Sequence, residues 1–194
     1  MIKEQFVKLY ENSFKNNWNL IAYSDYGTDV NLTYGEVAKE IAKLHLLFEK
    51  AGIQKGDKIA LVGRNSSRWA ITYLATVTYG AVVVPVLADF NPNDIHHIIN
   101  HSDSVLLFVS DKIWENLEEE KVSELRAVFS LSNFRCLHQK DGESIQKIIK
   151  SLDADFESKY PNALTADELF ELMRNFKYIV PQGSPMTGIG NHHQ

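Results

Sequence analysis

Cysteine, glycine and proline are all scarce in this sequence of 194 residues. Cys136 is the single cysteine, so no disulfide can form within the chain, and we expect a reducing compartment. The 10 glycines and 5 prolines are too few for a collagen-like, low-complexity or linker-rich protein. These absences leave a globular chain that is long enough to bury a hydrophobic core.

An excess of positive charge and a long hydrophobic run are missing as well. The 20 Lys and Arg residues face 25 Asp and Glu residues, and a net charge of −5 does not favour binding to nucleic acid. The longest apolar run, Ala81–Ala88, falls far short of the roughly 20 residues of a transmembrane helix, and the first residues lack the apolar core of a secretory signal. We therefore expect a cytoplasmic protein with no transmembrane segment and no nucleic-acid partner.

Three apolar runs separated by helical patterns predict an α/β fold. The runs cover residues 58–62, 81–86 and 105–109. Continuous hydrophobicity of this length is typical of parallel strands that are covered on both faces. Helices are expected near 33–51 and 67–79, and Asn91 followed by Pro92 is a strong signal for the start of another helix. We predict a layered domain with a mainly parallel sheet flanked by helices.

The segments on either side of these runs complete the predicted domain. A helix over 2–16 and a β-hairpin over 20–33 precede the sheet, and Thr33 with Glu36 has the spacing of a helix capping box. A second capping box, Thr165 with Glu168, opens a helix to about residue 175. The other expected elements are a helix over 111–120, a strand over 126–131, a loop over 132–143 and a helix over 144–158. We assign residues 1–178 to one α/β subdomain and residues 179–194 to an aperiodic tail.

Metal ligands and a reactive thiol are the first candidates for chemistry. His97 and His101 are four residues apart on an expected helix, a spacing that can chelate zinc, but neither Cys136 nor His138 is an evident third ligand. The glutamates between 115 and 124 point in different directions on a helix and favour a solvated surface. We expect no metal site, and we interpret Cys136 as an inert thiol in a loop.

Nucleotide-binding motifs of the common kinds are also missing. The sequence contains neither G-x-x-x-x-G-K-[ST] nor G-x-G-x-x-G, so it has neither of the usual glycine-rich loops that hold phosphates. Composition and spacing alone therefore indicate an α/β domain without an evident active site.

Four segments, in order and at matching intervals, resemble the core motifs of the adenylate-forming superfamily. This superfamily includes the acyl-CoA synthetases, the adenylation domains of peptide synthetases and the luciferases. The segments are Leu32–Val37 (LTYGEV), Gly52–Ala60 (GIQKGDKIA), Arg64–Trp69 (RNSSRW) and Thr78–Pro85 (TYGAVVVP). The resemblance is strong over residues 15–112 and loose over 113–170. Within the superfamily the chain is most similar to bacterial long-chain fatty acid–CoA ligases.

The resemblance implies a reaction and one site for it. Such ligases join a fatty acid to ATP in the presence of Mg²⁺, release pyrophosphate, and pass the acyl group to coenzyme A. In acyl-CoA synthetases the loop after the core motif that Thr78–Pro85 resembles lines the passage for the coenzyme A thiol, and here that loop is Leu87, Ala88, Asp89 and Phe90. A plain strand-to-helix connection is the alternative. We interpret Trp69 as a core residue rather than a contact for the acyl chain.

The sequence departs from the superfamily where ATP would bind. The expected phosphate loop ends in Lys-Gly, whereas the most similar segment, Gly183–Gly188, contains no lysine. The adenine and ribose motifs and the catalytic lysine are not found either. We therefore expect an inactive N-terminal fragment that self-associates through an exposed apolar face and has no bound cofactor of its own. ATP, Mg²⁺ and coenzyme A are implied for the complete enzyme, and binding of an acyl chain or of coenzyme A near Leu87–Phe90 stays open. The alternatives are a non-catalytic binding or regulatory module and a flavodoxin-like nucleotide binder.

Overall fold

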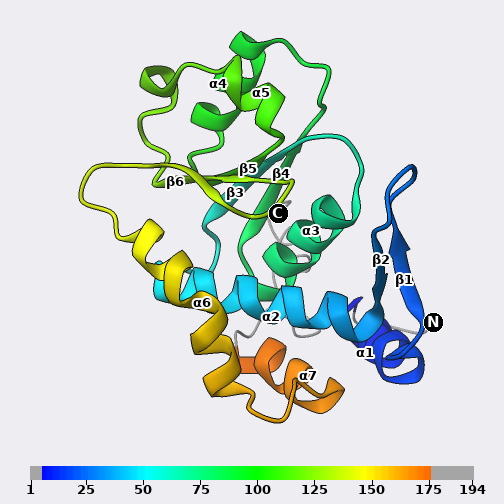
Figure 1. Cartoon of the computed structure of the whole chain (residues 1–194). Helices are drawn as coiled ribbons and strands as arrows, with labels where there is room; N and C mark the ends of the chain where they lie inside the picture. The colour runs from blue at the N-terminus through cyan, green and yellow to red at the C-terminus, as the bar shows by residue number, and fades with distance from the viewer. Residues whose placement is uncertain (1–5, 176–194) are drawn as a thin grey trace, which may run out of the picture.

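A central five-stranded β-sheet organises the chain, for which a computed structural model describes residues 6–175 (Figure 1). The strand order is β4-β3-β5-β6-β7. The strands are β3 (Lys58–Val62), β4 (Val82–Val86), β5 (Ser104–Val109), β6 (Ala127–Ser130) and β7 (Cys136–Gln139). The first four are parallel, and β7 pairs antiparallel with β6. The predicted positions of β3, β4 and β5 and the mainly parallel sheet are thereby confirmed.

The chain adds β4 on one side of β3 and all later strands on the other side. Helix α3 (Ser67–Tyr79) connects β3 to β4, and α4 (Pro92–His101) then leads back across β3 to β5 on its other side. Asn91 caps α4 by accepting a hydrogen bond from the Asp94 N–H at 2.9 Å, with Pro92 at the first helical position, as predicted. The two crossovers run in opposite directions along the sheet, so the sheet is doubly wound.

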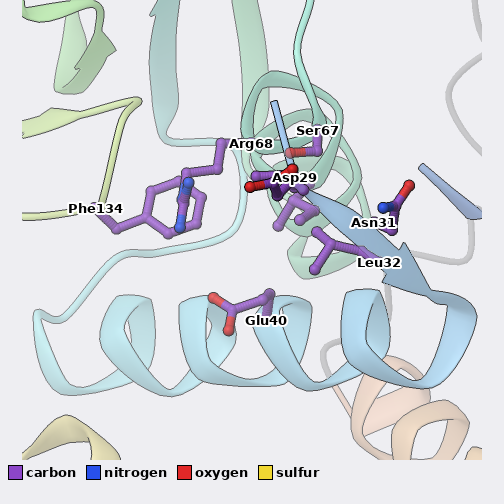
Figure 2. A pocket seen from close by; sticks show the side chains of 9 residues that line it. Asp29, Asn31, Leu32, Glu40, Ser67, Arg68 and Phe134 are labelled. Carbon is purple, nitrogen blue, oxygen red and sulfur yellow. The ribbon is translucent and has the colours of Figure 1, made fainter. Parts of the chain in front are cut away.

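The predicted N-terminal helix and β-hairpin precede this sheet. They are α1 (Phe6–Asn17), β1 (Ile21–Ser24) and β2 (Asn31–Thr33), and the two strands pair antiparallel. Helix α2 (Tyr34–Lys50) follows at once and begins with the predicted capping box, in which Thr33 Oγ1 accepts from the Glu36 N–H at 3.1 Å. Leu32 of β2 and Glu40 of α2 border a pocket beside the hairpin (Figure 2).

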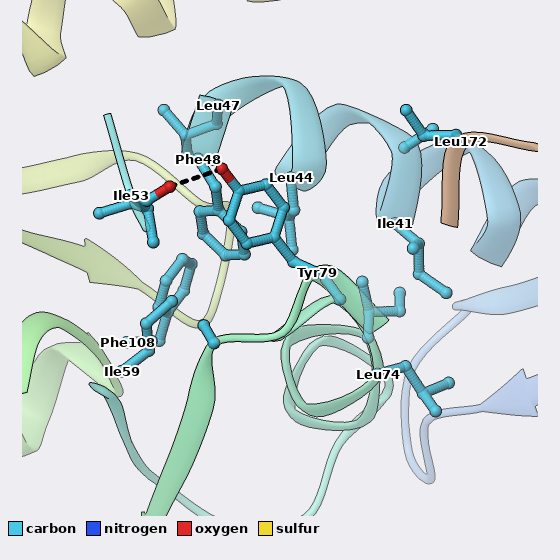
Figure 3. Close-up of a cluster of buried hydrophobic side chains, with 14 of the residues drawn as sticks. Ile41, Leu44, Leu47, Phe48, Ile53, Ile59, Leu74, Tyr79, Phe108 and Leu172 are labelled. Carbon is cyan, nitrogen blue, oxygen red and sulfur yellow. Dashed lines mark hydrogen bonds between the residues drawn. The ribbon is translucent and has the colours of Figure 1, made fainter. Parts of the chain in front are cut away.

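Side chains of the strands alternate between two hydrophobic clusters, one on each face of the sheet. Ile59 and Leu61 of β3 belong to the cluster that includes α2 and α3, whereas Ala60 and Val62 belong to the cluster that includes α4. Figure 3 shows the first cluster, in which the Tyr79 hydroxyl donates a hydrogen bond to the Ile53 carbonyl at 2.7 Å. Because helices cover both faces, the inner strands are continuous apolar runs.

Two further helices pack beside α2. They are α6 (Ile145–Lys159) and α7 (Ala166–Asn175) (Figure 1). The second predicted capping box is present, since Glu168 Oε2 accepts from the Thr165 N–H at 2.8 Å and Thr165 Oγ1 accepts from the Glu168 N–H at 3.3 Å. None of the helices within 6–175 combines the length and hydrophobicity that crossing a membrane requires. The predicted tail, 179–194, and its boundary at 178 lie outside the described residues.

The prediction of one helix over 111–120 is wrong. This segment contains α5 (Asp111–Glu115) and a 3₁₀ turn, η1 (Glu119–Val122). Leu117 lies between them and is only 8% exposed. A continuous helix would not allow the chain to turn back at this leucine, and the break buries it against the cluster on the α4 face.

The prediction of a loop over 132–143 is wrong as well. The predicted strand over 126–131 is confirmed as β6, but the chain then turns back and pairs with it as β7. Strand β7 has four residues, two of them polar, so it leaves little signal in the sequence. Cys136 therefore lies in a strand, opposite Phe129, and not in a loop.

The expectation that all three apolar runs are covered on both faces is wrong for β4. It is an edge strand, and Val82 is 46% exposed. The Val82 N–H donates to the Asp57 carbonyl of the neighbouring chain segment at 2.7 Å, so the backbone of Val83 and Pro85 faces outward by alternation. Proline has no N–H to offer, and Pro85 therefore limits the pairing of another strand with this edge.

Candidate functional site

Four strand-to-helix or strand-to-strand loops meet at the carboxyl edge of the sheet. Open, doubly wound sheets bind ligands at this edge, next to the point where the strand order reverses, which here lies between β3 and β5. Two adjoining hollows of about 510 Å³ each open there and share Arg64, Asn65, Ala88 and Asp89. We call them together the switch-point cleft. The other residues that line it are Gly63, Ser66, Trp69, Pro85, Val86, Leu87, Ser110, Asp111, Lys112, Ile113, Leu131 and Ser132.

Helix caps and one glycine fix the loops that form the cleft. Ser66 caps α3 by accepting from the Trp69 N–H at 3.1 Å, as Asn91 caps α4, so each loop runs from a strand end to a defined helix start. Gly63 follows β3, where a Cβ atom would lie 2.6 Å from Leu131 Cδ1. The absent side chain leaves room for the Leu131 side chain, which reaches from the end of β6 over the end of β3.

Positively charged, negatively charged and uncharged polar side chains all line the cleft. Arg64 Nη2 lies 3.9 Å from Asp89 Oδ1, and the side chains are 88% and 92% exposed, so this ion pair contributes little to stability. Asp111 Oδ2 accepts from Ser132 Oγ at 3.3 Å. The other carboxylate oxygen of Asp111 is buried and has no hydrogen-bond partner among the described residues. Such a set can hold a polar or anionic ligand by hydrogen bonds and single charges.

The predicted coenzyme A loop lies at this cleft in part. Leu87, Ala88 and Asp89 line it, and Leu87 is 68% exposed. Phe90 is 41% exposed and is not among the lining residues. Trp69 stacks on Tyr73 with ring centroids 5.6 Å apart and packs against the core, as predicted, but it also lines the cleft.

Sequence reasoning quoted Arg64–Trp69 and Thr78–Pro85 for the resemblance alone and gave them no site role, and it missed the remaining cleft residues altogether. A usable signal exists nonetheless. Arg64 and Asn65 come soon after the apolar run of β3, and Ser110 and Asp111 come directly after that of β5. Polar residues that follow neighbouring parallel strands converge at one edge of the sheet.

The metal and thiol candidates do not form a second centre. The rings of His97 and His101 stack on α4 with centroids 5.6 Å apart. Within residues 6–175, no group of three or more His, Cys, Asp or Glu side chains is placed to hold a metal ion. Cys136 is buried, burial raises the pKa of its thiol, and Sγ donates to the His138 carbonyl at 3.3 Å. A thiol with a raised pKa is a poor nucleophile.

Comparison with proteins of known identity gives one consistent family. Relatives include the crotonobetaine/carnitine–CoA ligase of Proteus mirabilis, 31% identical over 63% of this chain and 24% of that protein. Long chain acyl-CoA synthetase 1 of Arabidopsis thaliana is 25% identical over 66% of this chain and 20% of that protein. The probable CoA ligase CCL6 of Humulus lupulus is 28% identical over 63% of this chain and 19% of that protein. The chain thus spans about a fifth to a quarter of the length of these curated relatives.

Solved structures share the fold at lower identity. Coronafacic acid ligase from Pectobacterium brasiliense has a TM-score of 0.62 at 20% identity, with 72% of this chain and 27% of that chain covered. The N-terminal subdomain of NpsA from Klebsiella oxytoca has a TM-score of 0.56 at 20% identity, with 72% of this chain and 35% of that chain covered. The family model described as AMP-binding enzyme matches residues 10–173. The chain therefore belongs to the AMP-binding enzyme family, and its fold is that of the N-terminal subdomain of adenylate-forming ligases.

Proposed function

We propose that this chain is the N-terminal part of an AMP-forming acid–thiol ligase whose complete form activates a long-chain fatty acid with ATP and transfers it to coenzyme A. The observation that carries the proposal is the place of the family motifs in the fold. The segment Arg64–Trp69 runs along the switch-point cleft, and Thr78–Pro85 leads into the loop that borders it. The relatives are CoA ligases by name, and one is a long chain acyl-CoA synthetase.

The composition of the cleft supports a passage for coenzyme A along residues 87–90. Leu87, Ala88 and Trp69 give one wall an apolar surface, which suits the uncharged arm that carries the thiol. Arg64 and Lys112 supply positive charge that suits the phosphate groups of the same molecule. In this role the loop would bind and orient the thiol and take no part in proton transfer.

Exposed Leu87 offers a direct test of this passage. Leu87→Asp places a negative charge on the apolar wall, and we expect it to weaken the binding of coenzyme A, measured by calorimetry, about tenfold or more. Leu9→Asp is the matched control, because Leu9 is 51% exposed on α1 and does not line the cleft. Equal binding by wild type and Leu87→Asp, or no binding by the wild type, would count against the passage.

The chain as given is proposed to be inactive in adenylation. The reaction requires positive charge, normally including Mg²⁺, around the triphosphate while the carboxylate attacks the α-phosphorus. Within residues 6–175 no group of three or more His, Cys, Asp or Glu side chains is placed to hold a metal ion, and the segment Gly183–Gly188 has no lysine to neutralise the phosphates. Coenzyme A binding requires fewer convergent groups than catalysis and is compatible with this part of the fold.

Pyrophosphate exchange tests both statements. With palmitate, Mg-ATP and labelled pyrophosphate we expect no exchange above the blank without acid, while a complete ligase in parallel exchanges readily. Exchange by this chain would overturn the proposed inactivity. A coding sequence that continues into a phosphate loop would favour a ligase over a non-catalytic module, and tight binding of a flavin would favour a flavodoxin-like protein.

Self-association is proposed through the exposed apolar residues at the β4 edge, Val82, Leu87 and Phe90, in contact with a second copy. Because Pro85 limits strand pairing there, side-chain contacts would form the interface. Sedimentation at rising concentration should show an increasing average mass, and Val82→Lys should lower it. A strictly monomeric wild type would exclude this contact.

A further inference from the structure

A second, smaller pocket lies beside the hairpin, apart from the residues that line the switch-point cleft. Its volume is about 280 Å³ (Figure 2). Its walls come from the hairpin, from α2, from the first turns of α3 and from the turn between β6 and β7. The lining residues are Asp29, Val30, Asn31, Leu32, Glu40, Ser67, Arg68, Ile71 and Phe134. We call it the hairpin pocket, and a volume of this size suits a small metabolite.

One positive charge of the pocket is held in place but not neutralised. The Arg68 guanidinium lies over the ring of Phe134, with Cζ 5.6 Å from the centroid, and Figure 2 shows the two side chains together. The guanidinium N–H groups donate no hydrogen bond within residues 6–175, so this cation–π contact leaves them available to a ligand. Within the described part of the chain, Arg68 forms no ion pair.

The carboxylate of Glu40 is likewise unpaired within residues 6–175. Glu40 projects from α2 toward the pocket and forms neither an ion pair nor a side-chain hydrogen bond within residues 6–175. Lys43, one turn further along α2, would be its natural partner, but Lys43 Nζ binds Asp153 Oδ1 at 2.7 Å. Asp29 also lines the pocket, but its side chain is exposed and water solvates its charge, so Glu40 is the carboxylate that lacks compensation.

The start of α3 does not add to the positive charge of the pocket. Asp25 accepts from the Ser67 N–H at 2.7 Å and from Ser67 Oγ at 2.6 Å, so a carboxylate already faces the helix end. Arg68 is therefore the group left to bind an anion. The apolar side chains of Leu32 and Ile71 complete the lining.

We propose that the hairpin pocket binds a small zwitterion with an apolar body, the chemistry of a free apolar α-amino acid. The ammonium group of such a ligand would pair with Glu40 and its carboxylate with the edge of Arg68, while its side chain packs on Leu32 and Ile71. A ligand with one charge alone would leave the opposite charge of the pocket unpaired. This site is distinct from the proposed passage for coenzyme A, and it joins the hairpin to α2 and α3.

Calorimetric titration of the whole chain with L-leucine and its two single-charge analogues tests the proposal. Isocaproate keeps the carboxylate and isoamylamine keeps the ammonium group, and we expect leucine to bind about tenfold or more tightly than either. Because the comparison uses the wild-type protein, it does not depend on any variant folding. No binding at about 10 mM leucine, or equal binding by one analogue, would overturn the proposal.

Three variants locate the binding. Glu40→Gln and Arg68→Gln keep the size of each side chain and remove its charge, and each should weaken leucine binding about tenfold or more. Arg64→Gln is the matched control, because Arg64 lines the switch-point cleft and not the hairpin pocket. Loss of binding in Arg64→Gln alone would place the ligand elsewhere and refute the proposal. The outcome is independent of coenzyme A binding and pyrophosphate exchange.

Discussion

Phe108 and Phe90 show two opposite environments within one domain. Phe108 on β5 is 0% exposed, whereas Phe90, in the loop after β4, is 41% exposed. Phe108 stacks on Phe129 with centroids 4.8 Å apart and meets Phe48 edge-on at 6.2 Å, so it connects the sheet to α2. The contrast separates residues that hold the fold together from residues of the carboxyl-edge loops that remain exposed to solvent. Substitutions matched across the two regions can test whether this division holds.

The largest expected effect is that of Phe108→Ala. Removing a fully buried aromatic ring leaves a cavity between the sheet and α2, and we expect a loss of about 3–5 kcal/mol in the free energy of unfolding, measured by urea denaturation. Phe90→Ala is the matched control and should cost less than about 1 kcal/mol, because much of the ring is already in water. Similar losses for both variants would mean that the loop after β4 is part of the core.

Gly35→Ala is expected to cost up to about 3 kcal/mol. A Cβ atom at Gly35 would lie 2.7 Å from Trp18 Nε1 and 2.9 Å from Trp18 Cε2, and the indole ring is rigid and packs against the core. This close contact explains why the segment LTYGEV has glycine in the first turn of α2. In a Trp18→Ala background the same change should cost nothing or stabilise, and equal costs in both backgrounds would refute the steric cause.

Acidification from pH 7 to pH 5 is expected to lower stability by about 2 kcal/mol through His45. Its Nε2–H donates to the Ala75 carbonyl at 3.0 Å, and burial lowers the pKa of the ring to about 3. The unfolded chain binds this proton below its ordinary pKa of about 6.5, while the folded chain stays neutral, so stability falls as pH falls through this window. Burial also lowers the pKa of His96, which acts in the same direction.

Urea denaturation at several pH values checks this expectation. His45→Gln should flatten the slope of stability between pH 7 and 5, whatever its cost at pH 7. Carboxylates with lowered pKa values, such as Glu143 beside Arg126, lose their contribution at lower pH and do not produce this slope. An unchanged slope in His45→Gln would assign the effect to other groups.

The sequence predicts well those elements that are specified by neighbours along the chain. The capping boxes at Thr33 and Thr165 depend on residues three apart, the start of α4 depends on the adjacent pair Asn91 and Pro92, and all three are confirmed. The inner strands β3 and β5 are recognised because helices bury both faces, which makes them continuously apolar. Strand β4 has the same composition but lies at the edge, and edge position depends on the order of strands, which no local pattern encodes.

Elements that depend on distant contacts are the ones that sequence reasoning missed. Strand β7 exists because β6 offers it a partner, and the break in the predicted helix over 111–120 serves to bury Leu117. The cleft is a similar case. Arg64 belongs to a family motif, but nothing local pairs it with Asp111, and only the reversal of strand order between β3 and β5 brings their loops together.

Gly63→Ala should have the smallest effect, a change in stability within about 0.5 kcal/mol. This holds although a Cβ atom at Gly63 would lie closer to its nearest neighbour than one at Gly35. The added Cβ would lie 2.6 Å from Leu131 Cδ1, the far end of a flexible side chain that can rotate away, whereas Trp18 cannot. The lower backbone entropy of the unfolded alanine variant further offsets the cost. Because Leu131 lines the switch-point cleft, the change should appear there, as a shift of the Leu131 methyl resonances in NMR spectra. A loss of stability as large as that of Gly35→Ala would show that the carboxyl edge is packed as tightly as the core, and would remove the distinction between the two regions.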